Sequence, residues 1–206
     1  MTEAIDRASI EKVAIDLGTA MTADASEMLR MWLDQLVAWN AKLDLTAARG
    51  VPELLDLMLA DALVLAQHIP KDVTMVDVGT GAGAPGLSLA VLRPDLRVTL
   101  VEPLIKRVAF LRTALAAIGR TDVCVLRMKA GDLRVRWDVA VARATFPPPA
   151  WLEEGADLVR DGGSVWVLLA KEAPPSQPGA TLAEDITYTW PRTQVSRRAV
   201  RYVIDA

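Results

Sequence analysis

The chain has 206 residues, enough for one full domain with an extension and too few for two ordinary domains. Hydrophobic residues make up 52% of it and charged residues 24%, which is typical of folded globular proteins. Its apolar runs are short, and residues 1–30 lack a basic start followed by an apolar stretch. We therefore expect no membrane-spanning helix, no secretory signal and a cytoplasmic protein. The single cysteine, Cys124, excludes an internal disulfide and a cysteine-rich metal site.

Charge is unevenly distributed along the chain. Residues 1–70 hold 5 basic and 11 acidic residues, whereas residues 71–206 hold 18 basic and 15 acidic residues. A polyanionic partner would therefore meet the second part, where the stretch from Arg192 to Arg201 contains four arginines and no acidic residue. The alternative is that these arginines cover one solvated face of a strand pair.

The first 70 residues are expected to be helical. In residues 26–40 the apolar side chains recur at the spacing of an amphipathic helix. A second helix is predicted from Pro52, a favourable first-turn residue, to about Gln67, and Pro70 ends it. We interpret residues 1–70 as an N-terminal helical extension.

Strand and helix signals alternate after residue 70. Strands rich in Val or Leu are predicted at Thr74–Val78, Arg97–Glu102, Val123–Met128, Trp137–Ala142 and Ser164–Leu169. Helices are predicted from Gly83 until Pro94, from Pro103 to Gly119, and from about Pro149 to Arg160, the last ended by Asp161-Gly162-Gly163. This alternation predicts an α/β fold in which helices cover both faces of a mostly parallel sheet.

The end of the chain has a different pattern. The proline-rich stretch 173–180 is predicted to be a loop. Thr187–Trp190 and Ala199–Ile204 then have the pattern of two antiparallel strands. We interpret residues 71–206 as one domain, a Rossmann-like sheet that ends in this antiparallel pair.

A glycine-rich run lies between the first predicted strand and the helix after it. Residues 76–86 read Val-Asp-Val-Gly-Thr-Gly-Ala-Gly-Ala-Pro-Gly. The alternating glycines Gly79, Gly81 and Gly83 allow a turn whose backbone can approach a ligand closely. The following helix presents free N–H groups to electronegative atoms. Asp77 can organise this loop or accept hydrogen bonds from a ligand amine.

Glu102 makes the interpretation of this loop more specific. It ends the next strand, 23 residues after Gly79, where an acidic residue binds the ribose hydroxyls of an adenosine ligand. The Asp-x-Gly-x-Gly-x-Gly spacing favours S-adenosylmethionine (SAM) over NAD, whose fingerprint is Gly-x-Gly-x-x-Gly. The alternative is that Glu102 stabilises the N-terminus of the helix after Pro103. We therefore favour a class I SAM-dependent methyltransferase with a Rossmann-like fold, and an NAD-binding enzyme stays open on these residues.

Several motifs give the chain a specific resemblance to a known family. These motifs are Trp39–Arg49, the glycine loop with Pro85-Gly86, Arg93-Pro94-Asp95, the Lys-Arg-Val-Ala-Phe-Leu-Arg block at 106–112, Ala142-Arg143-Ala144 and Lys171. Over this region the chain resembles the bacterial small-subunit ribosomal RNA guanine-N7 methyltransferases, also called glucose-inhibited division protein B.

The resemblance implies roles for individual residues. Cofactor contacts would come from the glycine loop, at Gly79, Gly81, Gly83 and Ala84. Glu102 would bind the ribose, and the adenine would be lined by Ala130, Gly131 and Asp132. Arg143 would lie beside both cofactor and substrate as the catalytic residue. RNA contacts would come from Lys106, Arg107, Arg112 and Lys171.

The chain departs from the pattern of that family on the predicted substrate side. The substitutions are Met58 and Ala62 for His and Ser around a retained Asp61, Gly131 for an acidic residue, Thr145 for Phe, and Glu172 for Gly. The glycine loop and Glu102 keep the pattern. The methyl acceptor is therefore less firmly predicted than the donor.

The resemblance implies methylation of N7 of a guanine in small-subunit ribosomal RNA, with that RNA or the small subunit as partner; we expect a monomer. N7 has a free lone pair, so catalysis requires positioning for in-line attack rather than a general base. Arg143 would orient the base through its carbonyl edge or a phosphate; the alternative is a buried ion pair. Two other functions stay open: a methyltransferase for a small molecule or protein, and a SAM- or RNA-binding module without transfer activity.

Overall fold

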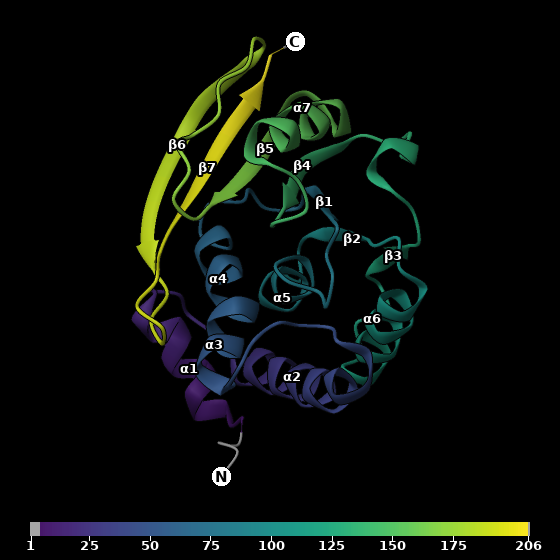
Figure 1. The fold of residues 1–206 in the computed structure, drawn as a ribbon, viewed down its shortest axis with the longest axis vertical. Coiled ribbons are helices and arrows are strands. Elements are labelled where there is room, and N and C mark those ends of the chain that lie inside the picture. Colours follow the sequence, from purple (N-terminus) through teal and green to yellow (C-terminus); the bar gives the residue numbers. More distant parts are fainter. Residues whose placement is uncertain (1–4, 206) are drawn as a thin grey trace.

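The computed structural model describes residues 5–205, which form one seven-stranded sheet with helices on both faces (Figure 1). The helical segments are α1 (Arg7–Asp16), α2 (Ala23–Leu43), α3 (Val51–Leu55), the π-helical turn η1 (Asp56–Ala60), α4 (Asp61–Leu65), α5 (Gly86–Leu92), α6 (Ile105–Ala117), the 3-10 turn η2 (Ala130–Asp132) and α7 (Pro148–Leu158). The strands are β1 (Thr74–Val78), β2 (Arg97–Val101), β3 (Cys124–Leu126), β4 (Trp137–Ala142), β5 (Val159–Leu169), β6 (Ala180–Thr189) and β7 (Ser196–Ile204).

The strands lie in the order β3-β2-β1-β4-β5-β7-β6. The first five are parallel to one another, whereas β7 is antiparallel to both β5 and β6. The predicted mostly parallel sheet with a C-terminal antiparallel pair is therefore confirmed. The strand order reverses between β1 and β4, and ligands bind parallel sheets at the carboxyl ends of the strands beside such a point.

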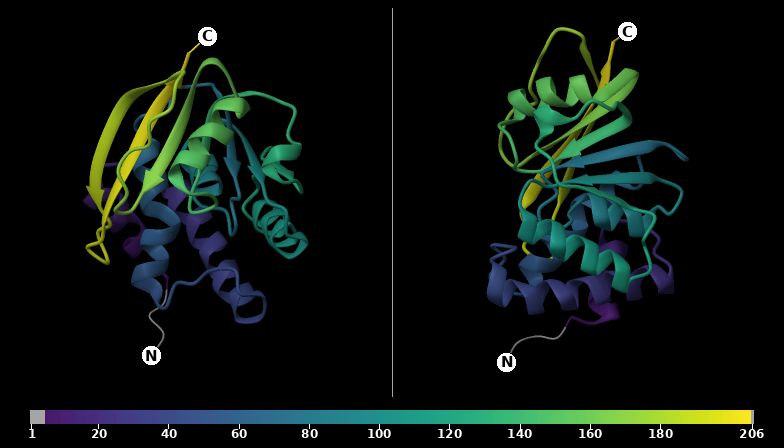
Figure 2. Two further views of the ribbon diagram at one scale, coloured as in Figure 1. Left: turned by 45° about the horizontal axis from the view of Figure 1, so that its top comes forward. Right: turned by 90° about the vertical axis from the view of Figure 1, so that its right-hand side faces the viewer.

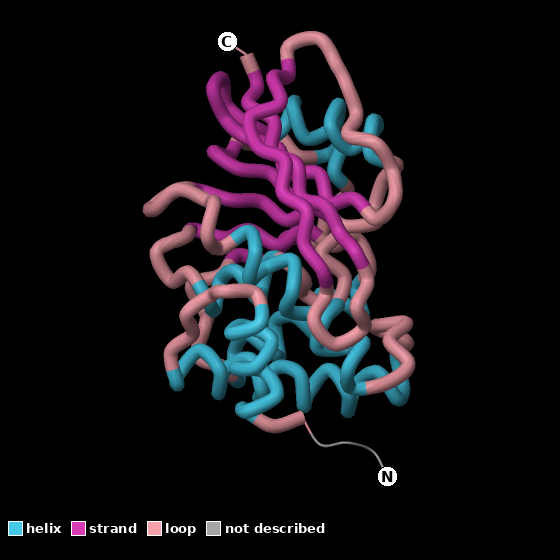
Figure 3. The backbone as a smooth tube through the Cα atoms, turned by 90° about the vertical axis from the view of Figure 1, so that its left-hand side faces the viewer, coloured by secondary structure: helices cyan, strands magenta, loops and turns pink. Residues whose placement is uncertain are grey.

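The two faces of the sheet have separate hydrophobic cores. Met75 of β1 packs into the core that contains α1 to α6, whereas Val76 and Val78 pack into the core that contains α7. This alternation follows from the two-residue period of a strand. Figures 2 and 3 show α7 on one side of the sheet and the other helices gathered on the opposite side.

The N-terminal helices belong to the larger of these cores. Trp32 and Leu36 of α2 are fully buried, as are Ile10 and Val13 of α1. Sequence analysis did not predict α1, whose buried stripe consists of only three residues. Among residues 5–205, no helix combines the length and apolar character required to cross a bilayer.

The second predicted helix is continuous but not uniformly α-helical. It spans α3, η1 and α4, with the π-helical turn at its centre. A π turn shifts the backbone hydrogen bonds by one residue, and such turns occur frequently at functional sites. The Met58 carbonyl of this turn accepts a hydrogen bond from the Ser88 hydroxyl at 2.6 Å, which ties the turn to α5.

Several predicted boundaries were wrong: β3 spans only Cys124–Leu126, for example, and β7 begins three residues earlier than predicted, at Ser196. Helix α7 ends at Leu158, and the Asp161-Gly162-Gly163 segment lies within β5 rather than in a terminating turn. Strand β6 begins at Ala180, seven residues before the predicted start. Its first half, Ala-Thr-Leu-Ala-Glu, is mostly exposed because β6 is an edge strand, so it lacks the run of Val and Leu residues that marks a buried strand.

Candidate cofactor and acceptor cavities

The glycine-rich loop after β1 has the strained backbone that its sequence predicts. Gly79, Gly81 and Gly83 have φ angles of +69°, +62° and +116°, which lie in the region that favours glycine. The amides of Gly79 and Thr80 donate to the Val101 carbonyl at 2.8 and 3.1 Å. The loop is thereby held against the carboxyl end of β2. A Cβ atom on Gly79 would overlap the Thr145 side chain.

The Asp77 side chain holds this loop in place through hydrogen bonds. It is fully buried, and its Oδ2 accepts hydrogen bonds from the Thr80 hydroxyl and the Gly86 amide, both at 2.7 Å. A Cβ on Gly86 would lie 2.6 Å from Asp77 and would displace this contact. Burial raises the pKa of Asp77 to about 6. Asp77 does not line the adjoining cavity, so the structure favours the first of its two predicted roles.

A cavity of about 500 Å³ lies over the loop, within the usual size range of ligand sites. Glu102 lines it and is 1% exposed. Its Oε2 accepts from the Gly81 amide at 3.0 Å and its Oε1 from the Leu104 amide at 2.9 Å. Glu102 therefore faces the cavity and also holds the residue that precedes α6. The glycine-loop residues of the lining are Gly79, Thr80, Gly81, Ala82 and Ala84.

A second cavity of about 340 Å³ adjoins the first. It shares Gly79, Pro103 and Thr145 with the first cavity, and it contains the predicted Ala130 and Gly131. The third predicted residue of this group, Asp132, is exposed and lies outside the lining. Together the two cavities form a site with the glycine loop between them, which we call the cofactor site.

Arg143 lies at the end of β4, between the cofactor site and a third cavity. Its side chain lines both cavities. The guanidinium donates to the Leu57 carbonyl of the π turn and to Asp61, which lies 3.2 Å away. The ion pair that was the alternative interpretation of Arg143 is therefore present, and it fixes the guanidinium at the boundary between the two cavities.

The third cavity has a volume of about 230 Å³, and we call it the acceptor cavity. Beside Arg143 its lining is rich in aromatic, basic and acidic side chains, namely Phe146, Tyr188, Trp190, Arg197, Asp61 and Glu172. Sequence analysis did not assign Tyr188 or Trp190 to a site. Both come from the hairpin formed by β6 and β7, which we call the C-terminal hairpin. The sequence alone does not show which parts of the chain this hairpin contacts.

Two buried carboxylates of the continuous helix α3–η1–α4 accept hydrogen bonds from this hairpin. Asp61 accepts from the Tyr188 hydroxyl at 2.7 Å and from the Trp190 indole at 2.9 Å. Asp56 accepts from the Thr193 amide at 2.7 Å, the Thr193 hydroxyl at 2.8 Å and the Arg192 amide. Because each carboxylate is satisfied by several donors, the wall of the acceptor cavity is fixed to the N-terminal part of the chain.

Of the four predicted RNA-contacting residues, only Arg107 lines one of these cavities. Arg107 lines the cofactor site and lies 3.7 Å from Glu102. Arg112 donates to the Val125 carbonyl at 3.1 Å, and Lys106 and Lys171 are exposed. Arg107, Arg112 and Lys106 share α6. Lys171 lies two residues after the end of β5 and is next to Glu172 of the acceptor cavity.

The C-terminal arginines are largely paired within the hairpin. Arg198 forms an ion pair with Asp185, and Arg201 pairs with Glu184 at 2.6 Å. The acidic partners belong to β6, the strand whose start sequence analysis placed too late. The alternative of a solvated strand face is therefore favoured for these two residues. Arg197 differs, because its guanidinium lies 4.0 Å from the centre of the Trp190 ring.

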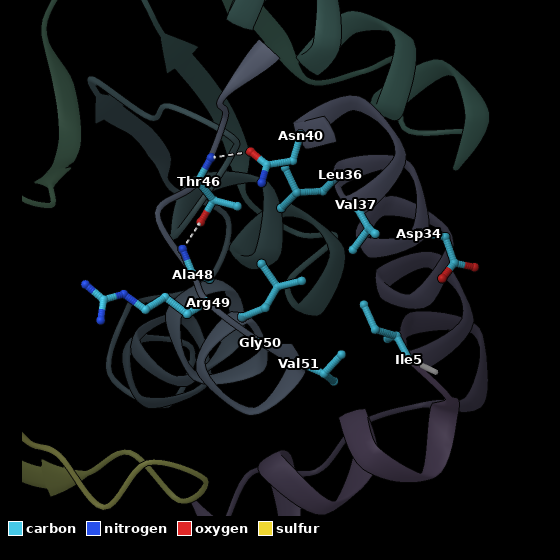
Figure 4. A pocket seen from close by; sticks show the side chains of 11 residues that line it. Ile5, Asp34, Leu36, Val37, Asn40, Thr46, Ala48, Arg49, Gly50 and Val51 are labelled. Carbon is cyan, nitrogen blue, oxygen red and sulfur yellow. Dashed lines mark hydrogen bonds between the residues drawn. The ribbon is translucent and has the colours of Figure 1, made fainter. Parts of the chain in front are cut away.

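Another cavity, of about 530 Å³, lies between α2 and the start of α3 (Figure 4). Its lining is mostly apolar and contains none of the predicted site residues. It shares only Thr46 with the cofactor site. The Asn40 side chain accepts from the Thr46 amide at 2.9 Å and so fixes the segment that separates the two cavities.

Trp32 supports the glycine loop from the N-terminal extension. Its indole donates to the Ala82 carbonyl at 3.2 Å, and a Cβ on Gly83 would lie 3.2 Å from its ring. Helical spacing predicts that Trp32 is buried, but it does not show which loop a buried side chain contacts. Within residues 5–205, no cluster of three or more His, Cys, Asp or Glu residues is arranged to hold a metal ion.

The fold and site together define a class I SAM-dependent methyltransferase. The glycine loop follows β1, an acidic residue ends β2, and both meet at the reversal of strand order. Solved methyltransferases share the fold. TrmN from Thermus thermophilus matches 80% of this chain and 53% of its own, with a TM-score of 0.54 and 22% identity. A methyltransferase from Pyrococcus furiosus matches 88% of this chain and 100% of its own, with a TM-score of 0.56 and 14% identity.

The sequence comparisons identify the family to which the chain belongs. The family model described as rRNA small subunit methyltransferase G matches residues 25–177, and this chain belongs to that family. The relative of that name from Anaeromyxobacter dehalogenans (strain 2CP-C) is 34% identical, over 90% of this chain and 92% of its own. The relative of the same name from Myxococcus xanthus is 35% identical, over 82% of this chain and 80% of its own. The protein is therefore a methyltransferase, and SAM is its methyl donor.

Proposed function

We propose that this protein methylates N7 of a guanine in the RNA of the small ribosomal subunit, as a monomer in the cytoplasm. The observation that carries the proposal is that Arg143 lines both the cofactor site and the acceptor cavity. The relatives named above support the substrate, since each is named as a small-subunit ribosomal RNA methyltransferase. We further propose that residues 71–206 form the catalytic domain and residues 1–70 an extension that supports it.

The residues of the cofactor site fit SAM. Gly81 has a positive φ angle and open space where a Cβ would be, so its backbone is accessible to a ligand. We assign Glu102 to the ribose hydroxyls, since each carboxylate oxygen has a second lone pair. Ala130 and Gly131 would line the adenine. The remaining cofactor contacts would come from Ala84 and Arg143, with Asp77 holding the loop. Gly83 and Asp132, which the resemblance also implied, lie outside the lining of the site.

SAM supplies an electrophilic methyl group, and guanine N7 supplies a lone pair that needs no prior deprotonation. The protein therefore has to position the acceptor and to exclude water. Arg143 is suited to orient a base because the Leu57 carbonyl and Asp61 hold its guanidinium in place. Alignment of this kind can contribute about 7–11 kcal/mol in model reactions.

The exposed basic residues would hold the RNA backbone. Lys106, Arg107 and Arg112 lie on one helix next to the cofactor site, and Lys171 lies beside the acceptor cavity. Phosphate contacts of this type fix the position of a nucleic acid but carry no sequence information. The target base would have to leave its stack to enter the acceptor cavity, as in other enzymes that modify bases.

Transfer from labelled SAM tests the proposal. Undermethylated small subunits, naked ribosomal RNA and a small-molecule extract are incubated with the enzyme in parallel. We expect label in subunits or RNA. Label confined to the extract, or to ribosomal protein, would overturn the proposed substrate. SAM binding in calorimetry with no transfer to any fraction would indicate a binding module.

A further inference from the structure

The acceptor cavity is lined by two carboxylates that differ in how many further hydrogen bonds they can accept. Asp61 is 3% exposed, and both of its oxygens are engaged, Oδ1 by Tyr188 and Trp190 and Oδ2 by Arg143. Asp61 therefore has little capacity left to accept a hydrogen bond from a ligand. Its role is to position Arg143 and the aromatic wall.

Glu172 is the second carboxylate, and only one of its oxygens is used. Oε2 accepts from the Ala170 amide at 2.9 Å and from the Lys171 amide at 3.0 Å. These contacts pin the carboxylate beside the end of β5. Oε1 makes no hydrogen bond with the residues that the structure describes, so both of its lone pairs are available. Glu172 also lines the acceptor cavity.

The Glu172 carboxylate is exposed to solvent and is ionised at neutral pH. The backbone N–H groups of Glu172, Ala170 and Lys171 hold the pKa of the Glu172 carboxyl below its usual value. Arg197, on the same cavity wall, lowers it further. An ionised carboxylate only accepts hydrogen bonds, so it selects ligands that present donors.

Guanine presents two adjacent donors, N1–H and the N2 amino group. Adenine has a lone pair at N1 and no N2 amino group, so the same carboxylate would repel it. We propose that Glu172 recognises the N1–H and N2 amino group of the acceptor guanine and so determines the base specificity of the acceptor cavity. This role rests on the proposed function.

The orientation of the base is compatible with the reaction. N7 and N2 lie on opposite edges of guanine, so a base held through N1 and N2 keeps N7 free. Arg197, whose guanidinium covers one face of Trp190, supplies a flat cationic surface on the same wall. Such surfaces stack well against splayed bases.

Nucleotide binding tests the role of Glu172. Guanosine, inosine and adenosine 5′-monophosphates are titrated by calorimetry into the full-length protein with S-adenosylhomocysteine present. Inosine lacks only the N2 amino group, and adenosine also lacks the N1 donor. We expect the wild type to bind the guanosine nucleotide at least about tenfold more tightly than either of the others, the effect of one charge-assisted hydrogen bond.

Glu172→Gln should remove this preference, because the amide keeps one oxygen for the backbone and turns a donor toward the base. Glu153→Gln, an exposed change on α7 outside the acceptor cavity, is the matched control and should keep the preference. A wild type without the preference, or a Glu172→Gln variant that retains it, would overturn the role of Glu172.

Transfer to small subunits, measured on the same preparations, separates this inference from the proposed function. Wild-type transfer together with an unchanged preference in Glu172→Gln refutes the role of Glu172 alone. No wild-type transfer to ribosomal RNA refutes the proposed function, whatever the nucleotides show.

Discussion

The cofactor site and the acceptor cavity meet at Arg143, yet they are built differently. The cofactor site is lined by several segments between residues 45 and 145, but the largest part of its lining is one short run of backbone, residues 79–84, beside Glu102 at the end of the neighbouring strand. The acceptor cavity is lined by side chains from four segments between residues 57 and 197, and none of them is a backbone loop of this kind. One site is thus centred on a local backbone structure, and the other is an assembly of side chains from distant segments.

This difference determines how each site responds to substitution. The glycine loop is held by backbone hydrogen bonds to β2 and by the buried Asp77, so a change there affects the shape of the loop. The acceptor wall is held by Asp56 and Asp61, which join the second helix to the C-terminal hairpin. A change there leaves the loop intact. The two sites should therefore fail separately, one losing cofactor affinity and the other losing transfer.

Arg143→Ala should give the largest effect, because Arg143 belongs to both sites. We expect kcat/KM for transfer to small subunits to fall about 100-fold or more, as misplacement of a reacting group does, while SAM affinity changes less than tenfold. Calorimetry and steady-state transfer measure the two quantities. Arg160→Ala, which breaks an ion pair between Arg160 and Asp138, is the control. Wild-type turnover in Arg143→Ala would remove Arg143 from the site.

Gly79→Ala tests the backbone character of the cofactor site. The new Cβ combines a positive φ with an overlap on Thr145, so we expect SAM affinity to fall at least about tenfold. Gly18→Ala is the matched control, since Gly18 has a φ of +68° and no atom lies within 4 Å of its Cβ position. It should lose about 1 kcal/mol of stability with unchanged SAM affinity. Equal effects on affinity would show that the loop shape is unimportant.

Glu102→Ala should weaken SAM binding about tenfold, provided that the carboxylate holds the ribose. Part of this loss would come from the Gly81 amide, which donates to Glu102. Glu102→Gln separates the contributions, because it keeps an acceptor for that amide but places a donor in the cavity. Unchanged affinity in both variants, measured by calorimetry, would mean that the ribose lies elsewhere.

The same contrast explains what could be predicted from the sequence. The strands β1 and β4 and the glycine loop were predicted at their observed bounds, because buried strands and positive-φ glycines leave strong local patterns. Tyr188 and Trp190 were missed because their partner, Asp61, lies more than 120 residues away in the sequence. The start of β6 was missed because an edge strand needs few apolar residues. No local pattern records which distant side chains share a cavity.

The pH dependence of stability should show the smallest effect. Burial raises the pKa of Asp77 to about 6, so between pH of about 4 and 6 the folded state binds more protons than the unfolded state. Its contribution to stability is therefore lost as the pH rises through this window. The free energy of unfolding of the wild type, measured relative to Asp77→Asn in urea, should fall between pH of about 4 and 7.

Asp95→Asn is the control for this measurement. Arg93 holds the pKa of Asp95 at about 2, so the contribution of Asp95 is lost only as the pH falls below its unfolded value of about 4. The difference in the free energy of unfolding between the wild type and Asp95→Asn should stay constant over the pH range in which the difference between the wild type and Asp77→Asn falls. A flat profile for Asp77→Asn as well would show that Asp77 does not titrate there.

The identity of the methylated nucleoside tests the central claim most directly. Undermethylated small subunits are incubated with the enzyme and labelled SAM, the RNA is digested, and the labelled nucleoside is identified by chromatography and mass spectrometry. The joint action of the two sites at Arg143 predicts 7-methylguanosine as the labelled product, lost in Arg143→Ala. Label on another base, on another atom of guanine, or on protein would contradict it.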